Sequence, residues 1–131
     1  MSTSIHCAMT KLVCSKCSKE HNPSVPLWKC TCGGLLDIEH ESTFPIKEIC
    51  ERKPTMWRYR EALPITDYKK IITFDEGFTP LLELKFNNRP VLIKQEQLFS
   101  TGSYKDRGAS VLVSKIKELG IDPNKVDPVI S

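Results

Sequence analysis

Four of the six cysteines in this 131-residue chain lie in two close pairs, which is the arrangement that a metal site requires. The pairs are Cys14-x2-Cys17 and, after a gap of 12 residues, Cys30-x-Cys32. Four thiolates on two short turns can bind zinc tetrahedrally, whereas disulfides are disfavoured in a reducing cytosol. The second pair has one intervening residue where two are usual. We therefore predict a zinc site formed by Cys14, Cys17, Cys30 and Cys32.

Three short strands are expected to support this site, over residues 11–14, 27–30 and 35–38. Gly33 and Gly34 follow Cys32, and glycine allows the positive φ of a tight turn after a ligand. His21 is the natural substitute if one cysteine is not a ligand, although its position before Asn22-Pro23 favours a plain loop residue. Cys7 and Cys50 have no partner at ligand spacing, so we expect both to be free thiols.

Lys105 is a second candidate for a chemical role, because it lies where a strand is expected to turn into a helix. Residues 91–96 have the composition of a strand. Apolar residues then recur with helical spacing up to Gly120, at Ala109, Leu112, Ile116 and Leu119. The dipole of a helix N-terminus disfavours an ammonium and favours a neutral amine, which can form a Schiff base. Read without its neighbours, Lys105 is only one of 19 basic residues, on the solvent face of an amphipathic helix.

Three motifs around this lysine resemble the N-terminal part of threonine synthase. They are Glu76-Gly77-Phe78-Thr79-Pro80-Leu81, Lys94-x-Glu96 and Thr101-Gly102-Ser103-Tyr104-Lys105-Asp106-Arg107-Gly108. The resemblance extends from about Leu12 to Ile121. Small departures occur at Asp75, Ser100 and Tyr104, where the family usually has glycine, proline and phenylalanine. None of them removes the lysine.

The resemblance implies an α/β protein in which a small zinc ribbon precedes the beginning of a pyridoxal-phosphate-dependent domain of fold type II. We expect the ribbon over residues 1–40, a linker over 41–55 and the catalytic part over 56–131. Lys105 would bind pyridoxal 5'-phosphate covalently and shuttle protons, and the loop around residues 76–81 would border the active site. Ser103 would cap the helix or approach the cofactor phosphate, and capping is the better supported role.

The activity that the resemblance implies is a lyase reaction of threonine biosynthesis, the conversion of O-phosphohomoserine to threonine and phosphate. Threonine dehydratase and cysteate synthase are alternatives within the same fold, and a stand-alone zinc-binding interaction module is an alternative from another class. The phosphate cradle and the pyridine-nitrogen partner that this cofactor needs are not visible. In the family they lie downstream, so we expect a truncated N-terminal fragment, inactive alone, whose site a downstream polypeptide or a homodimer would complete.

Composition agrees with a cytoplasmic location. A hydrophobic content of 40% and a charged content of 27% are ordinary for a globular chain. The net charge of +3 is too small to indicate a nucleic-acid partner, and no apolar run approaches the roughly 20 residues that span a membrane. The N-terminus also has no signal-peptide core. From the charge, the apolar runs and the N-terminus together, we expect neither a membrane nor a nucleic-acid partner.

The remaining elements before Lys105 are expected to form, with the helix that follows it, the opening of an α/β domain. Thr55 can cap a short helix over residues 56–63 that Pro64 closes, with Trp57 as a packing anchor. Two strands are expected over residues 81–85 and 91–96, around a turn at Asn87 and Asn88.

Four charged residues lie close to Lys105 in the sequence. We expect Asp106 and Arg107 to form a structural pair at the start of the helix. Lys94 and Glu96 alternate with apolar neighbours on a strand, so exposure to solvent and support of the site are equally good interpretations.

Overall fold

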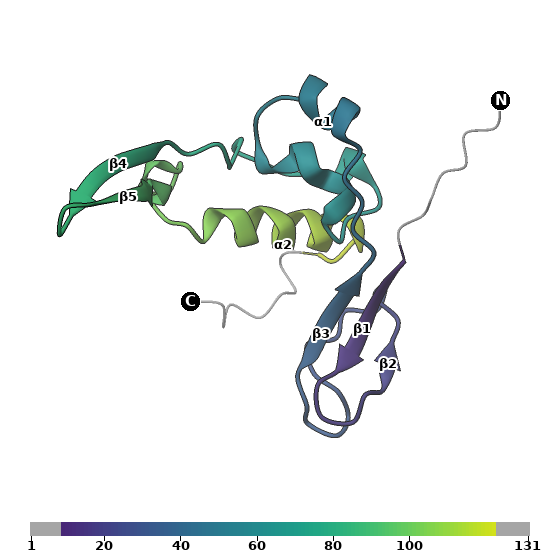
Figure 1. The fold of residues 1–131 in the computed structure, drawn as a ribbon. Helices are drawn as coiled ribbons and strands as arrows, with labels where there is room; N and C mark the ends of the chain where they lie inside the picture. Colours follow the sequence, from purple (N-terminus) through teal and green to yellow (C-terminus); the bar gives the residue numbers. More distant parts are fainter. Residues whose placement is uncertain (1–8, 123–131) are drawn as a thin grey trace.

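A small antiparallel sheet forms the N-terminal part of the chain, in a computed structural model that describes residues 9–122 (Figure 1). Its strands are β1 (Thr10–Cys14), β2 (Glu20–His21) and β3 (Leu36–His40), in the order β2-β1-β3. Strand β1 pairs with β3 along its whole length, from Thr10 opposite His40 to Cys14 opposite Leu36. This pairing confirms the strands predicted over residues 11–14 and 35–38.

The prediction of a strand over residues 27–30 is wrong. Only an isolated bridge between Lys29 and Leu35 occurs there, and the third strand of the sheet is β2 instead. The physical reason is that Cys30 uses its backbone groups in a local turn. Its amide donates to the carbonyl of Gly34 at 2.9 Å, and its carbonyl accepts from the amide of Gly33 at 2.9 Å.

Short helices follow the sheet. They are α1 (Ile46–Glu51), the 3-10 helices η1 (Met56–Ala62), η2 (Tyr68–Lys70) and η3 (Glu96–Leu98), and the longer α2 (Asp106–Glu118). Helix α1 lies inside the segment that the sequence suggested as a linker. Thr55 caps η1 as predicted, because its side chain accepts a hydrogen bond from the amide of Trp57 at 3.2 Å.

The ends of helix α2 agree with the sequence signals. Lys105 is its N-cap residue, and Gly120 follows its last turn with a φ of +66°. The amide of Gly120 donates to the carbonyl of Lys117 at 3.2 Å, and that of Ile121 donates to the carbonyl of Ile116 at 3.1 Å. These two bonds are a Schellman motif, which uses the left-handed conformation that glycine adopts without strain.

Helix α2 buries two of its serines more fully than its apolar residues. Ser110 and Ser114 are buried, whereas Leu112 remains 46% exposed. The hydroxyl of Ser110 accepts from the indole nitrogen of Trp57 at 2.9 Å and donates to the carbonyl of Ile72 at 2.7 Å. Ser114 accepts from the amide of Ile72 at 2.8 Å. The small side chains therefore let the backbone approach closely, and Trp57 is confirmed as a buried anchor.

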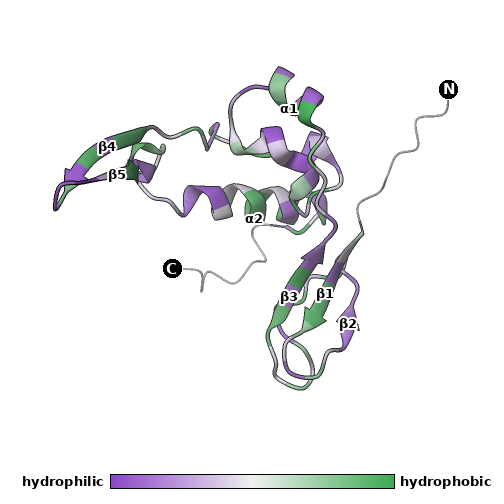
Figure 2. Cartoon of the chain, viewed as in Figure 1, coloured by the Kyte–Doolittle hydropathy of each residue, from purple (hydrophilic) through white to green (hydrophobic). Residues whose placement is uncertain are grey.

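A hairpin of two strands, β4 (Leu81–Phe86) and β5 (Arg89–Lys94), projects from this part of the chain (Figure 1). Asn87 and Asn88 have positive φ values of 49° and 61°, as the predicted two-residue turn requires. All twelve strand residues are exposed, although hydrophobic residues occur along both strands (Figure 2). Helices long and apolar enough to cross a membrane do not occur in residues 9–122.

Candidate metal centre and lysine site

The four cysteines predicted to bind metal meet at one end of the sheet. The sulfur atoms of Cys14, Cys17, Cys30 and Cys32 all lie within 4.8 Å of one another. Three of the distances are shorter: 3.5 Å for Cys14 to Cys32, 3.7 Å for Cys17 to Cys30 and 3.5 Å for Cys17 to Cys32. Zinc–sulfur bonds of about 2.3 Å place the sulfurs of a tetrahedral site about 3.8 Å apart. The cluster therefore has the dimensions needed to hold a metal ion.

The first cysteine pair lies on a turn that begins where β1 ends. The amide of Lys16 donates to the sulfur of Cys14 at 3.4 Å, and the amide of Ser18 donates to the carbonyl of Cys14 at 2.9 Å. Ser18 takes a positive φ of 57°, which closes the turn. The amide of Cys14 donates to the carbonyl of Lys19 at 3.0 Å and joins the turn to the returning chain.

The second pair is compact enough to complete the cluster despite its single intervening residue. Gly33 has a φ of +81°, as expected for the residue after the second cysteine. Gly34 is needed for a different reason, since a Cβ there would lie 2.6 Å from the sulfur of Cys14 and 2.8 Å from the Cβ of Lys16. The absence of a side chain at Gly34 therefore allows the two turns to meet.

Hydrogen bonds divide negative charge unequally among the sulfurs. The pKa of Cys30 falls to about 5, because its sulfur accepts from the backbone of Cys32 and from the ring of His21. Backbone hydrogen bonds from Cys17 and Lys16 also lower the pKa of Cys14. In contrast, the pKa of Cys32 is raised to about 12: a backbone bond from Gly34 lowers it, but hydrogen bonds with the neighbouring sulfurs outweigh that effect. The hydrogen bonds of Cys14 and Cys30 thus favour the thiolate, the form in which cysteine binds a metal ion.

The weaker candidates for metal binding lie in different places. His21 is in strand β2 and not in a loop, and its Nε2 atom lies 3.3 Å from the sulfur of Cys30. Pairing of His21 with Leu12 in β1 could have revealed this proximity, because Leu12 and Cys14 lie on the same face of that strand. Cys50 is an exposed free thiol outside the cluster. Cys7 lies outside the described residues.

Lys105 occupies the N-cap position of α2, as its sequence context predicted. Its side chain is exposed, and no hydrogen bond or ion pair holds its ammonium group within residues 9–122. The hydroxyl of Ser103 accepts a hydrogen bond from the backbone amide of Lys105 at 3.2 Å, so Ser103 stabilises the turn that enters the helix. Gly102 supplies a φ of +74° in the same turn. The amine is therefore accessible to a ligand.

The predicted pair between Asp106 and Arg107 does not form, because each side chain has another partner. The buried carboxylate of Asp106 accepts from the amide of Thr101 at 3.0 Å and also from the hydroxyl of Thr101. Arg107 binds both carboxylate oxygens of Glu96, at 2.7 and 2.9 Å. Both residues nevertheless have the structural role that the sequence suggested.

Glu96 connects three segments around the lysine. Besides Arg107, its carboxylate accepts from the hydroxyl of Thr79 at 2.5 Å and lies 3.7 Å from the Lys94 ammonium. Arg107 is the main reason that the pKa of Glu96 falls to about 2. Glu96 thus joins the loop before β4, the end of β5 and the start of α2. Of the two interpretations that the sequence left open for Glu96, the structure favours support of the site.

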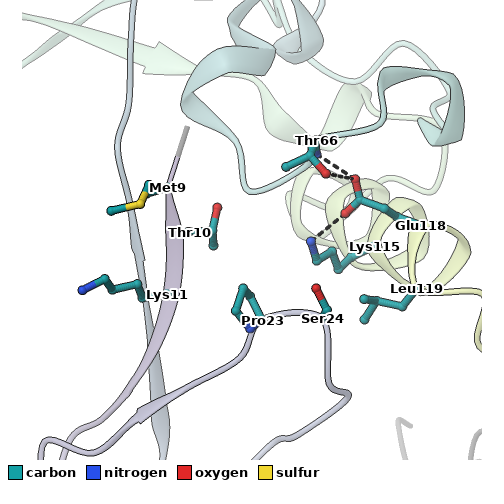
Figure 3. Close-up of a pocket in the computed structure, with 9 residues that line it drawn as sticks. All are labelled: Met9, Thr10, Lys11, Pro23, Ser24, Thr66, Lys115, Glu118 and Leu119. Atoms are coloured by element: carbon teal, nitrogen blue, oxygen red, sulfur yellow. Dashed lines mark hydrogen bonds and ion pairs between the residues drawn. The ribbon is translucent and has the colours of Figure 1, made fainter. Parts of the chain in front are cut away.

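A surface pocket lies between the sheet and α2 (Figure 3). Its charged residues already have partners: Glu118 accepts hydrogen bonds from Thr66 at 2.7 and 2.8 Å and from Lys115 at 2.6 Å, and Lys11 forms an ion pair with Glu20 at 2.9 Å. The pocket lining includes neither the cysteine cluster nor Lys105. We therefore assign it no chemical role.

Comparison with known proteins identifies relatives of this chain. It is 36% identical to the threonine synthase of Methanocaldococcus jannaschii over 119 residues. This aligned region is 83% of the chain and 29% of that protein. It is 32% identical over 123 residues to the threonine synthase of Methanosarcina acetivorans, which covers 87% of the chain and 30% of that protein. The chain resembles the N-terminal portion of threonine synthase.

A third threonine synthase, from Synechocystis sp., is 34% identical over 82 residues, or 58% of the chain and 22% of that protein. The chain spans about 30% of the length of the first two threonine synthases that it matches. No protein-family profile matches it, and neither does any solved structure. The matches to these threonine synthases confirm the similarity that the motifs around Lys105 predicted.

Proposed function

We propose that this chain contributes to a threonine synthase-like lyase that uses pyridoxal 5'-phosphate to convert O-phosphohomoserine to threonine and phosphate. The observation that carries the proposal is the position of Lys105. Its accessible amine lies at the start of α2, inside the motif by which the chain resembles threonine synthase. The names of the relatives support this choice over threonine dehydratase and cysteate synthase.

The residues around Lys105 fit the proposed cofactor. Lys105 would hold it covalently through Nζ, and the same nitrogen would accept and return a proton at the substrate carbons. The Ser103 hydroxyl lies in the turn that enters α2, from which it would donate a hydrogen bond to the cofactor phosphate. When bound, pyridoxal phosphate supplies an electron sink for negative charge on a substrate carbon. Glu96 and Arg107 would fix the helix that carries the lysine.

We further propose that the four cysteines bind one zinc ion with a structural role. Four protein thiolates fill a tetrahedral site and leave no position for a substrate, which distinguishes structural from catalytic zinc. The three-stranded sheet is small, and Cys14 is the one residue in its strands that is buried, while Cys30 is buried in the adjoining turn. Metal binding would therefore supply much of its folding free energy.

A chimera tests the lyase proposal. This chain would replace the corresponding N-terminal portion of the M. jannaschii threonine synthase, and release of phosphate from O-phosphohomoserine would be measured. We expect turnover in the chimera, none with Lys105→Ala, and unchanged turnover with Lys117→Ala, which removes another exposed lysine of α2. Equal turnover by the Lys105→Ala and Lys117→Ala chimeras would refute the role of Lys105.

A further inference from the structure

We propose that His21 is a positioning residue for the metal centre, one that donates a hydrogen bond to the sulfur of Cys30 without itself binding the metal. This inference rests on the proposed zinc site. Its geometric basis is the 3.3 Å distance between His21 Nε2 and Cys30 Sγ, which is a normal length for a hydrogen bond to sulfur.

The sheet brings His21 to the cluster. His21 lies opposite Leu12 on the neighbouring strand, and side chains of opposite residues project from the same face. Cys14 follows Leu12 by two residues, so it also projects from that face. Strand β2 is only two residues long, and its register is therefore what places the imidazole beside the ligands.

The chemistry of the two groups determines the direction of the hydrogen bond. A metal-bound cysteine is a thiolate, which has no hydrogen to donate, so Nε2 must carry the proton and donate it. The four sulfurs already supply the number of ligands that zinc takes in a structural site. His21 is therefore left with the outer position, from which it orients Cys30 and offsets part of the negative charge of four thiolates.

The expected consequence is tighter metal binding. Loss of an outer hydrogen-bond partner of a metal ligand typically costs about 10- to 100-fold in affinity. His21→Leu removes the donor and keeps comparable bulk, so we expect its zinc affinity to fall by that factor. His21→Gln retains an N–H donor and should recover most of the affinity.

The test is a chelator competition for zinc with the full chain, the two His21 variants and a control. The control is Glu20→Gln on the same strand, which breaks only an exposed ion pair with Lys11 and should leave affinity unchanged. Cobalt(II) then serves as a spectroscopic probe. A hydrogen bond lowers the energy of the sulfur electron pair, so His21→Leu should move the sulfur-to-cobalt charge-transfer band to longer wavelength. Its d–d bands should keep the pattern of four sulfur ligands.

Two results would overturn the role of His21 alone. The first is that the parent chain binds one zinc, while His21→Leu has the same zinc affinity and the same charge-transfer band as the parent chain. The other is a changed d–d pattern in His21→Leu, which would make His21 a ligand. Absence of zinc from the parent chain would instead overturn the metal site itself, and with it the role of His21.

Discussion

Gly34→Ala should weaken metal binding for a purely steric reason. The added Cβ would lie 2.6 Å from the sulfur of Cys14, whereas ordinary van der Waals contacts to a Cβ begin at about 3.4 Å. The second neighbour, the Cβ of Lys16 at 2.8 Å, belongs to the same turn, so neither atom can yield without moving the first cysteine pair. Overpacking of this kind costs about 1–3 kcal/mol, which corresponds to roughly 5- to 150-fold in zinc affinity.

The matched control is Gly108→Ala in α2. A Cβ at Gly108 meets nothing within 4 Å, and alanine is favoured over glycine in a helix by about 1 kcal/mol. We therefore expect Gly108→Ala to leave zinc affinity unchanged and to raise the melting temperature slightly. Chelator competition and thermal unfolding of both variants measure these effects. Parental zinc affinity in Gly34→Ala would refute the close approach of the two cysteine turns.

Three further predictions concern packing, pH and the chain in isolation. Trp57→Phe loses the hydrogen bond to Ser110, so it should lower the free energy of unfolding in a denaturant titration by about 0.5–1.5 kcal/mol. Trp28→Phe, at a 72% exposed position, is the control and should have no effect. Since the pKa of Glu96 is depressed to about 2 from 4.5, its stabilising contribution is present above pH 4.5 and is lost as the pH falls toward 2. Acid titrations of unfolding should show this loss, and Glu96→Gln should reduce it. The 131-residue chain alone should show no turnover and should attach pyridoxal phosphate weakly and at several lysines. Stoichiometric attachment at Lys105 together with turnover would contradict that expectation.

The sequence predicted local features wherever one residue type determines the geometry. Gly120 ended helix α2 because a positive φ is required there, and Asn87 and Asn88 formed the hairpin turn for the same reason. The cysteine spacing similarly predicted a cluster, because two short turns bring four sulfurs together.

The features that the sequence did not reveal depend on contacts between distant segments. Helical spacing predicted an apolar face for α2, of which Ile116 and Leu119 are only half-buried, whereas Ser110 and Ser114 are buried and hydrogen-bonded to Ile72. Arg107 was expected to pair with its neighbour Asp106, yet a helix directs consecutive side chains apart and Arg107 reaches Glu96. His21 looked like a loop residue because a strand of two residues leaves almost no pattern.

The site at which pyridoxal phosphate becomes attached tests the central proposal most directly. The chimera with the M. jannaschii threonine synthase would be treated with borohydride to make the attachment permanent, digested and mapped by mass spectrometry. We predict one cofactor per chain on the peptide that contains Lys105, with the same result in Lys117→Ala and no attachment there in Lys105→Ala. Attachment at another lysine of the parent chimera, with Lys105 unmodified, would contradict the account.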